Sequence, residues 1–126
     1  SRADGIGLNL LKLVNVGKCI VSTETNKVVH WRAKKLNIEC NQSIKDKGEF
    51  LKKYALKNNI KLKNFAFVGN DINDLPALKI VGIPIGVADS HPSITEYLKI
   101  ILKNKGGYGA VREVCDLIYK SKNRFY

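Results

Sequence analysis

Oxygen-bearing side chains follow an apolar stretch in FVGNDINDLPAL, residues 67–78. Asn70, Asp71, Asn73 and Asp74 place four carboxamides or carboxylates within five positions. Such a run can cap a helix, because Asx side chains accept hydrogen bonds from free backbone N–H groups. It can also bind a cation such as Mg²⁺, which prefers hard oxygen ligands. The stretch alone leaves both interpretations open.

Two further segments could hold an anion. In IVST, Ser22 and Thr23 follow a short β-rich run, and hydroxyls beside a helix start suit a phosphate. In SIKDKGEFL, Lys45 and Lys47 stand at the start of a predicted helix, where the helix dipole disfavours cations unless an anion lies nearby. Each feature alone also has a plainer interpretation: a serine cap and solvated lysines.

The elements that would position these groups alternate along the chain. Apolar runs predict strands at 18–22, 64–69, 83–88 and 99–102, the second of them buried and the last at a sheet edge. Helical spacing predicts helices at 7–16, 25–38, 47–59, 72–82, 91–98 and 107–122. Thr25 is the expected cap of the second helix, while Gly17 and Gly82 are expected to close the first and fourth.

This alternation predicts one α/β domain over residues 1–126, a parallel sheet with helices on both faces. Ligands of such sheets bind at the carboxyl ends of the strands. The polar stretches after Val21 and Val68 lie at two such ends. We therefore expect the hydroxyl, lysine and Asx groups to meet at one edge of the sheet.

Composition argues against several classes of protein. The 126 residues are 44% hydrophobic and 26% charged, which suits a globular domain. No apolar run approaches the roughly 20 residues of a membrane span, and no secretory signal is visible. Three widely spaced cysteines fit neither a disulfide framework nor a zinc site. We expect a reduced, cytoplasmic protein that does not bind a membrane.

The net charge of +11 comes mostly from lysines spread along the chain, and no nucleic-acid motif accompanies them. We expect a solvated lysine-rich surface and no nucleic-acid partner. The remaining alternative is a positive field that attracts an anionic small substrate.

The order strand–Ser, helix–Lys, strand–GNDxxD resembles the haloacid dehalogenase (HAD) phosphohydrolase superfamily. RADGIGLNLLK (2–12), VADSHP (87–92) and GGYGAVREVCDLI (106–118) are similar to its sugar-acid phosphatase branch, which includes phosphatases of 3-deoxy-manno-octulosonate 8-phosphate (KDO 8-phosphate). Related modules act on nine-carbon ulosonic acid phosphates or sit at the C-terminus of acylneuraminate cytidylyltransferases. The resemblance covers about residues 2–119 and implies a Rossmann-like HAD fold without a large cap domain.

The resemblance also implies roles for the matching residues. Ser22 would hydrogen-bond the transferring phosphoryl group, and Lys47 would neutralise its charge and that of the nucleophile. Asn70 and Asp71 would belong to a Mg²⁺-binding site, while Asp74 would support the loop. We expect removal of Lys47 to lower turnover strongly with little loss of fold.

Further positions follow from the same resemblance. Gly69 would support the metal loop, and Thr23, Glu24 and Arg112 would contact the substrate. The expected partner is a small-molecule sugar-acid phosphate, and the expected assembly is a homo-oligomer, a tetramer in the related enzymes.

The chain departs from this pattern at the nucleophile. The superfamily's nucleophilic aspartate lies in a DxD motif after the first, central strand, and no DxD occurs in this sequence. Asp4 and Asp46 stand in other motifs. We expect an N-terminally truncated piece of a phosphatase that lacks this strand and is inactive on its own. The alternative is a non-catalytic HAD-like assembly module of an acylneuraminate cytidylyltransferase.

Two other departures concern metal and substrate. Asn70 offers oxygen without charge where many relatives have aspartate, which predicts weaker Mg²⁺ binding. Glu24 stands where KDO 8-phosphate phosphatases tend to carry arginine, and it favours a nine-carbon acid phosphate over KDO 8-phosphate. The plainer interpretation of Glu24 is a favourable charge at a helix start.

Overall fold

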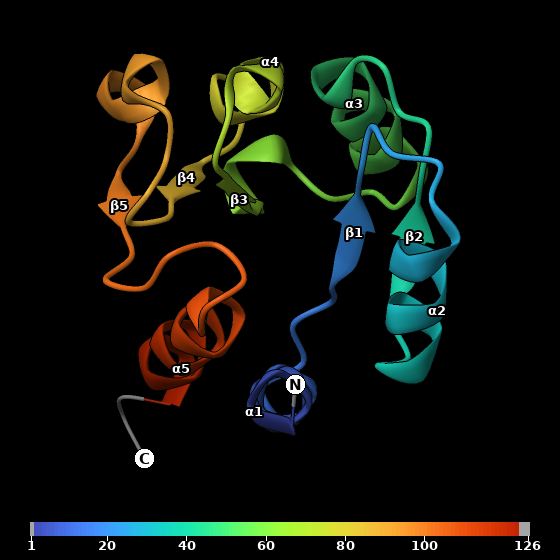
Figure 1. Cartoon of the computed structure of the whole chain (residues 1–126), viewed down its shortest axis with the longest axis vertical. Coiled ribbons are helices and arrows are strands. Elements are labelled where there is room, and N and C mark those ends of the chain that lie inside the picture. Colours follow the sequence, from blue (N-terminus) through green and yellow to red (C-terminus); the bar gives the residue numbers. More distant parts are fainter. Residues whose placement is uncertain (1, 124–126) are drawn as a thin grey trace. The chain divides into compact units, whose positions relative to one another are not determined.

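The structure is a computed structural model that describes residues 2–123 (Figure 1). The helices are α1 (Arg2–Leu13), α2 (Lys27–Lys35), α3 (Lys47–Lys57), α4 (Leu75–Leu78) and α5 (Ala110–Asn123). The strands are β1 (Cys19–Val21), β2 (Glu39–Asn41), β3 (Ala66–Gly69), β4 (Ile83–Gly86) and β5 (Ile100–Ile101). Short 3₁₀ turns cover Leu62–Asn64, Ile72–Asp74 and Pro92–Tyr97.

The chain divides into two compact units, one made of Ser1–Ile44 with Gly109–Tyr126 and the other of Lys45–Tyr108. The expectation of a single domain over 1–126 stays a prediction. Every strand pair in the described residues is parallel, as the alternating pattern predicted. No helix within residues 2–123 is both long and apolar enough to cross a membrane.

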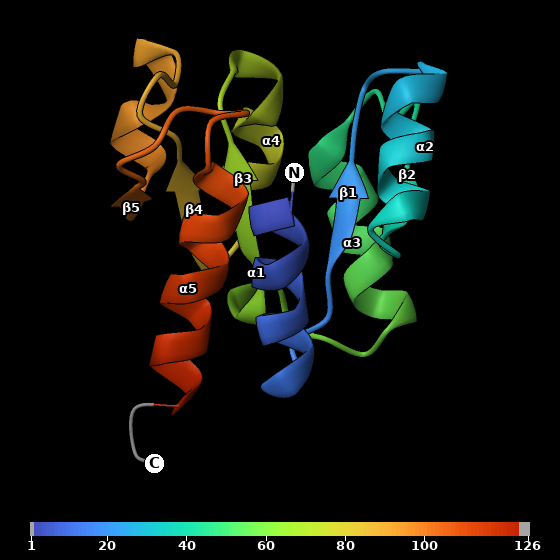
Figure 2. The same cartoon turned by 60° about the horizontal axis from the view of Figure 1, so that its bottom comes forward.

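In the first unit, β1 and β2 form a two-stranded parallel sheet, with Ile20 opposite Cys40. Helices α1 and α5 lie side by side (Figure 2). Their contact depends on Gly7, because a Cβ there would lie 3.0 Å from the Cβ of Cys115 and 3.0 Å from the Cδ of Arg112. Leu11 is among the apolar side chains buried in this unit.

Two expected helix boundaries in the first unit are wrong. Helix α2 is capped by Asn26, not Thr25: the Asn26 Oδ1 accepts hydrogen bonds from the backbone N–H groups of Val28 (2.7 Å) and Val29 (3.2 Å). Helix α1 ends at Leu13, before Gly17, because Asn15 takes up a left-handed conformation with φ of 59°. Asparagine tolerates that region better than most residues, so it can end a helix as glycine does.

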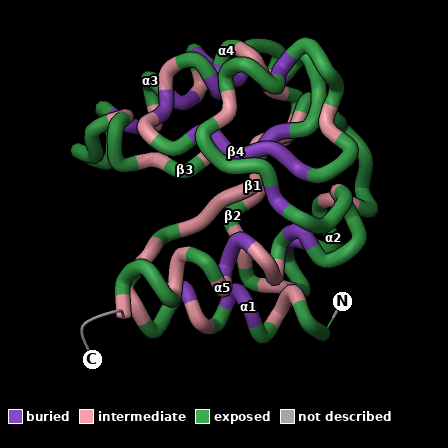
Figure 3. The backbone as a smooth tube through the Cα atoms, turned by 90° about the vertical axis from the view of Figure 1, so that its left-hand side faces the viewer, coloured by how far each residue is buried: buried purple, intermediate pink, exposed green. Residues whose placement is uncertain are grey.

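The second unit contains a three-stranded parallel sheet in the order β3-β4-β5. Its buried residues lie mostly on β4, α4 and the segments after them, coloured purple in Figure 3. Ile85, Leu78 and Ile94 are each at most 2% exposed. The edge position predicted for residues 99–102 is confirmed by β5.

The buried character predicted for the strand at 64–69 is wrong in part. Strand β3 pairs with β4 alone among the described strands, and Val68 is 40% exposed. Ala66 is exposed as well, whereas Phe67 is half-buried. Alternate residues of a strand point to opposite faces, so one face of this apolar strand is covered and the other is open.

Gly82 does not end the fourth helix, since α4 stops at Leu78. Gly82 is instead the point where two backbones touch: its N–H donates to the carbonyl of Leu62 at 3.0 Å. A Cβ at Gly82 would lie 1.8 Å from the carbonyl oxygen of Lys63. Only glycine fits such a close backbone approach.

Candidate active site

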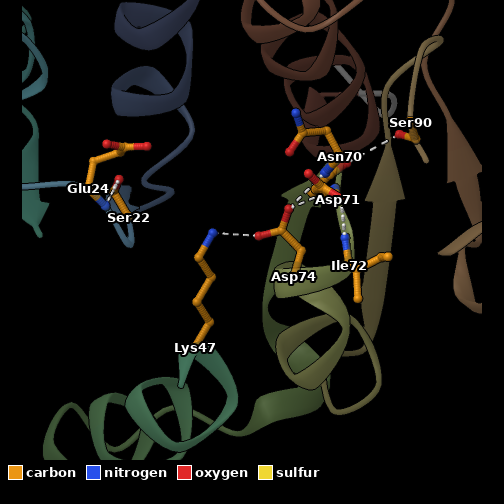
Figure 4. A network of polar contacts seen from close by, with 9 residues as sticks. Ser22, Glu24, Lys47, Asn70, Asp71, Ile72, Asp74 and Ser90 are labelled. Carbon is orange, nitrogen blue, oxygen red and sulfur yellow. Dashed lines mark hydrogen bonds and ion pairs between the residues drawn. The ribbon is translucent and has the colours of Figure 1, made fainter. Parts of the chain in front are cut away.

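The loop after β3 is organised around the carboxylate of Asp74, which is 3% exposed. One oxygen, Oδ2, accepts hydrogen bonds from the backbone N–H groups of Asn70 (2.9 Å) and Asp71 (3.2 Å). The other, Oδ1, lies 2.6 Å from the Nζ of Lys47 (Figure 4). Both oxygens of Asp74 therefore have partners, and the side chain holds the loop and the lysine together.

The local sequence explains why the chain turns here. Asp71 caps the following 3₁₀ turn, with its Oδ1 accepting from the N–H of Ile72 at 2.7 Å and its carbonyl from the N–H of Asp74 at 3.0 Å. Gly69 must lack a side chain, because a Cβ there would lie 2.7 Å from the Cβ of Asp74. The capping interpretation of the Asx-rich run is thus correct for Asp71 and Asp74.

Lys47 lies at the first position of α3 and is 8% exposed. The helix is capped by Asp46, whose Oδ1 accepts from the N–H of Glu49 at 3.0 Å. Gly48 permits close packing of α3 on α4, since a Cβ there would lie 2.8 Å from the carbonyl oxygen of Pro76. This packing brings Lys47 to a carboxylate 27 positions further along the chain.

The interpretation of both lysines as solvated is therefore wrong for Lys47, whereas Lys45 is exposed. The anion expected beside the helix start is, within this chain, the carboxylate of Asp74. An ammonium group has three N–H donors, and Asp74 engages one of them in the described structure. The remaining donors can serve a second anion such as a phosphoryl oxygen.

The burial of this ion pair argues against the expectation that Lys47 can be removed with little loss of fold, which stays untested. The side chains of Lys47 and Asp74 are 10% and 4% exposed. Removing one partner of a buried pair leaves the other charge uncompensated, which costs about 3–5 kcal/mol. Lys47 must therefore contribute to stability as well as to any chemistry.

Ser22 follows the end of β1 in the first unit and is half-buried. Its backbone N–H donates to the carbonyl of Asn41 at 2.9 Å, and its Oγ accepts from the N–H of Glu24 at 3.0 Å. Because that contact uses a lone pair, the hydroxyl hydrogen can still donate to an anion. Ser22 is not a helix cap, since Asn26 has that role.

The three residues expected to contact substrate also lie in the first unit. Thr23 and Glu24 are exposed, and both precede the Asn26 cap of α2. Arg112 is half-buried on α5, and its Nε lies 2.9 Å from the Oδ1 of Asp116, one helical turn away. The structure thus brings Lys47, Gly69, Asn70, Asp71 and Asp74 together in the second unit. That the first-unit residues join them in one site stays a prediction.

Two residues remain as candidate ligands of a metal ion, Asn70 and Asp71, both exposed. The side chain of Asn70 makes no hydrogen bond to another residue in the described part of the chain, and Asp71 uses one carboxylate oxygen on Ile72. Carboxamide and carboxylate oxygens are hard ligands, so this donor set fits Mg²⁺. Within residues 2–123, no group of three His, Cys, Asp or Glu side chains is placed to hold a metal ion.

Ser90 and His91 support the same loop and were not predicted as site residues. The Ser90 hydroxyl accepts from the N–H of Val87 at 2.8 Å and donates to the carbonyl of Gly69 at 3.4 Å. The backbone N–H of His91 donates to the carbonyl of Asn70 at 2.8 Å. Two sequence signals pointed to them: their position just after the strand that neighbours β3, and their place in VADSHP (87–92), one of the segments that carry the family resemblance.

A profile of the haloacid dehalogenase-like hydrolases matches residues 11–114 of this chain. The chain belongs to the haloacid dehalogenase-like hydrolase family. The resemblance stated from the motifs is thereby confirmed, and the HAD fold is confirmed by solved structures.

Solved KDO 8-phosphate phosphatases superimpose closely on the chain. The enzyme from Moraxella catarrhalis, in complex with a magnesium ion, a phosphate ion and a KDO molecule, gives a TM-score of 0.91 at 35% identity, covering 98% of this chain and 71% of that one. The enzyme from Yersinia pestis gives 0.88 at 30% identity, covering 98% and 69%.

Curated relatives point to the same branch of the HAD family. The 3-deoxy-D-manno-octulosonate 8-phosphate phosphatases KdsC from Yersinia pestis and Escherichia coli (strain K12) are 31% and 32% identical to this chain. Each alignment covers 96% of this chain and 65% of the relative. The chain therefore spans about two thirds of the length of the phosphatases that it matches.

Proposed function

We propose that this chain forms most of a magnesium-dependent phosphatase that hydrolyses KDO 8-phosphate or a closely related sugar-acid phosphate. The observation that carries the proposal is the buried Lys47–Asp74 pair, which fixes a cation beside the Asx-rich end of β3. The similarity to KDO 8-phosphate phosphatases along nearly the whole chain supports the substrate class.

In this proposal, Lys47 and Ser22 act on the phosphoryl group. Lys47 presents its remaining N–H donors to the phosphoryl oxygens, while Asp74 keeps the ammonium group in place. Ser22 donates its hydroxyl hydrogen, because its Oγ is already oriented by the N–H of Glu24. Both groups are held before substrate arrives, and preorganised donors stabilise developing charge at low reorganisation cost.

Asn70 and Asp71 are the residues of this chain that would hold Mg²⁺. A bound magnesium ion supplies charge neutralisation on the phosphate. Because Asn70 is uncharged, we expect this side of the site to depend on further carboxylates for tight binding. We propose that those carboxylates, and the nucleophilic aspartate, come from a DxD segment that the present sequence does not contain.

Substrate contacts and assembly complete the proposal. Arg112 is the proposed partner of the sugar-acid carboxylate, and Thr23 and Glu24 are the proposed contacts of its hydroxyl groups. A homotetramer is proposed by resemblance to the sugar-acid phosphatases. Glu24 is an argument for a nine-carbon acid phosphate as substrate, whereas the similarity to KDO 8-phosphate phosphatases is an argument for KDO 8-phosphate. Both substrates are therefore tested in the first assay.

The experiment compares two proteins, the 126-residue chain and a version extended at its N-terminus by a DxD-bearing strand. Phosphate release from KDO 8-phosphate and from a nine-carbon ulosonic acid 9-phosphate is measured with Mg²⁺ and with EDTA. We expect turnover only in the extended protein and only with Mg²⁺.

Turnover by the 126-residue chain that disappears on Asp71→Ala would refute the need for a DxD segment. An extended protein that folds but releases no phosphate would favour the non-catalytic assembly module instead.

A further inference from the structure

An open groove of about 1060 Å³ lies between α1 and α2 in the first unit. Helix α1 contributes Arg2, Gly5, Ile6 and Asn9, and α2 with the turn after it contributes Val28, Trp31, Arg32, Lys35, Leu36 and Asn37. No residue that we assign to phosphate, metal or sugar lines this groove. It is therefore a separate feature of the molecule.

Large apolar side chains along the groove are open to solvent. Trp31 is 61% exposed, Val28 60% and Ile6 47%. A single exposed apolar residue is ordinary, whereas three that line one concave surface offer a partner a continuous apolar wall. Tryptophan and arginine are enriched in protein–protein interfaces and among the residues that dominate their binding energy, and the groove offers Trp31 with Arg2 and Arg32.

The charges of the groove have one sign. Arg2, Arg32 and Lys35 line it, and within residues 2–123 no aspartate or glutamate does. Helix α2, KVVHWRAKK, has no acidic residue at all, and the Nζ of Lys34 lies 5.4 Å from the centre of the Trp31 ring. A ligand that fills this groove must combine apolar groups for the walls with negative charge for the rim.

We propose that the α1–α2 groove binds an acidic amphipathic helix of a partner protein. Helices α1 and α2 have 12 and 9 residues, so the groove offers a track of roughly 13–18 Å at 1.5 Å per residue. That length matches a partner helix of about three turns. Its apolar face would lie against Ile6, Val28 and Trp31, as in other helix-in-groove complexes.

Other occupants fit the groove less well. A second copy of this chain has no acidic helix to place in the groove, because none of the described helices α1–α5 carries a net negative charge. The phosphates of a nucleic acid would be attracted to the basic side chains, and its bases could stack on Trp31. The aliphatic side chains of the walls, however, have no hydrogen-bond donors for the phosphates. An anionic membrane presents a flat surface, not a body that enters a groove.

The test uses the full chain and the fluorescence of Trp31, which is the only tryptophan in the sequence. The probe is a synthetic 14-residue peptide with leucines at helical spacing on one face and glutamates on the other. We expect a saturable blue shift of Trp31 emission, with affinity that falls as salt rises from 50 to 300 mM. A scrambled peptide and a peptide with lysine in place of glutamate serve as controls.

Charge reversal in the groove provides the second readout. With fluorescein-labelled peptide, Arg32→Glu/Lys35→Glu is expected to weaken binding at least tenfold. The matched control is Lys53→Glu/Lys57→Glu on exposed positions of α3, expected to change it less than twofold after correction for net charge. Circular dichroism checks the fold of each variant, and Arg32→Gln/Lys35→Gln replaces any reversal variant that is unfolded.

Several results would overturn the proposal. One is the absence of any emission shift, and another is an equal shift with the scrambled or lysine peptide. A stronger shift with an oligo-dT strand or with phosphatidylglycerol vesicles would assign the groove to nucleic acid or membrane. A shift that depends on protein concentration alone would assign it to a second copy.

Discussion

Replacing Lys47 by methionine tests the buried ion pair on which the candidate site depends. Methionine keeps much of the apolar stem, so the change removes mainly the charge. It leaves the Asp74 carboxylate buried, which costs about 3–5 kcal/mol in general. Asp74 keeps its two backbone N–H partners, at 2.9 and 3.2 Å, so we expect the lower end, about 3 kcal/mol.

Urea unfolding followed by circular dichroism measures this loss. With a slope of about 1.5 kcal/mol per M, the midpoint should fall by about 2 M. Lys45→Met is the matched control, because Lys45 is exposed two positions away, and it should change the free energy of unfolding by less than about 0.5 kcal/mol. The double variant Lys47→Met/Asp74→Asn should lose about 2 kcal/mol less unfolding free energy than the sum of the losses in the two single variants.

Two results would refute this reasoning. One is a urea midpoint for Lys47→Met within error of that for Lys45→Met, which would mean that the pair is not buried in solution. Alternatively, the two changes could prove additive, which would mean that Lys47 and Asp74 stabilise the fold independently.

Three further predictions follow from other positions. Gly82→Ala should destabilise the fold by more than about 2 kcal/mol because its Cβ would overlap the carbonyl of Lys63, whereas Gly17→Ala, with no atom within 4 Å, should be neutral in the same unfolding assay; equal effects would contradict the close approach. Burial, followed by the charges of Asp116 and Asp4, raises the pKa of Cys115 from 9.0 to about 11. The neutral Cys115 thiol therefore stabilises the fold fully below pH 9, and this stabilisation is lost as pH rises toward 11. Wild type should therefore lose about 1 kcal/mol more than Cys115→Ala between pH 8 and pH 10, and parallel losses would show that Cys115 is not desolvated. In the extended enzyme, Glu24→Arg should shift the ratio of kcat/KM toward KDO 8-phosphate and away from the nine-carbon phosphate, because arginine can clamp a carboxylate; an unchanged ratio would leave Glu24 without a role in specificity.

Sequence patterns predicted most of the elements because apolar periodicity is a local property. The helix at Lys47–Lys57 and the strands at 66–69 and 83–86 fall inside their predicted ranges. Strand β2 was not predicted, since Glu39–Asn41 has three residues, too few for an alternating pattern to be recognised. It forms because it pairs in register with β1, and that partner is about 20 positions away.

The candidate site shows the same division between local and distant causes. The Asx-rich loop and its capping role could be predicted from spacing alone, because Asp71 and Asp74 act on neighbouring backbone groups. The burial of Lys47 could not, because its partner lies 27 positions away and the approach depends on Gly48 packing against Pro76. Ser90 likewise acts through a backbone carbonyl 21 positions earlier in the chain.

The most direct test of the proposed function is the turnover number for phosphate release from KDO 8-phosphate by the DxD-containing protein. Wild type, Lys47→Met and Lys45→Met are compared with Mg²⁺ at 10 °C, and circular dichroism is used first to check that each variant is folded. Loss of one preorganised donor to the transition state costs roughly 3–4 kcal/mol, so Lys47→Met should lower kcat by two to three orders of magnitude while Lys45→Met stays within threefold of wild type. A folded Lys47→Met protein with kcat within threefold of wild type would contradict the assignment of Lys47 to the phosphoryl group.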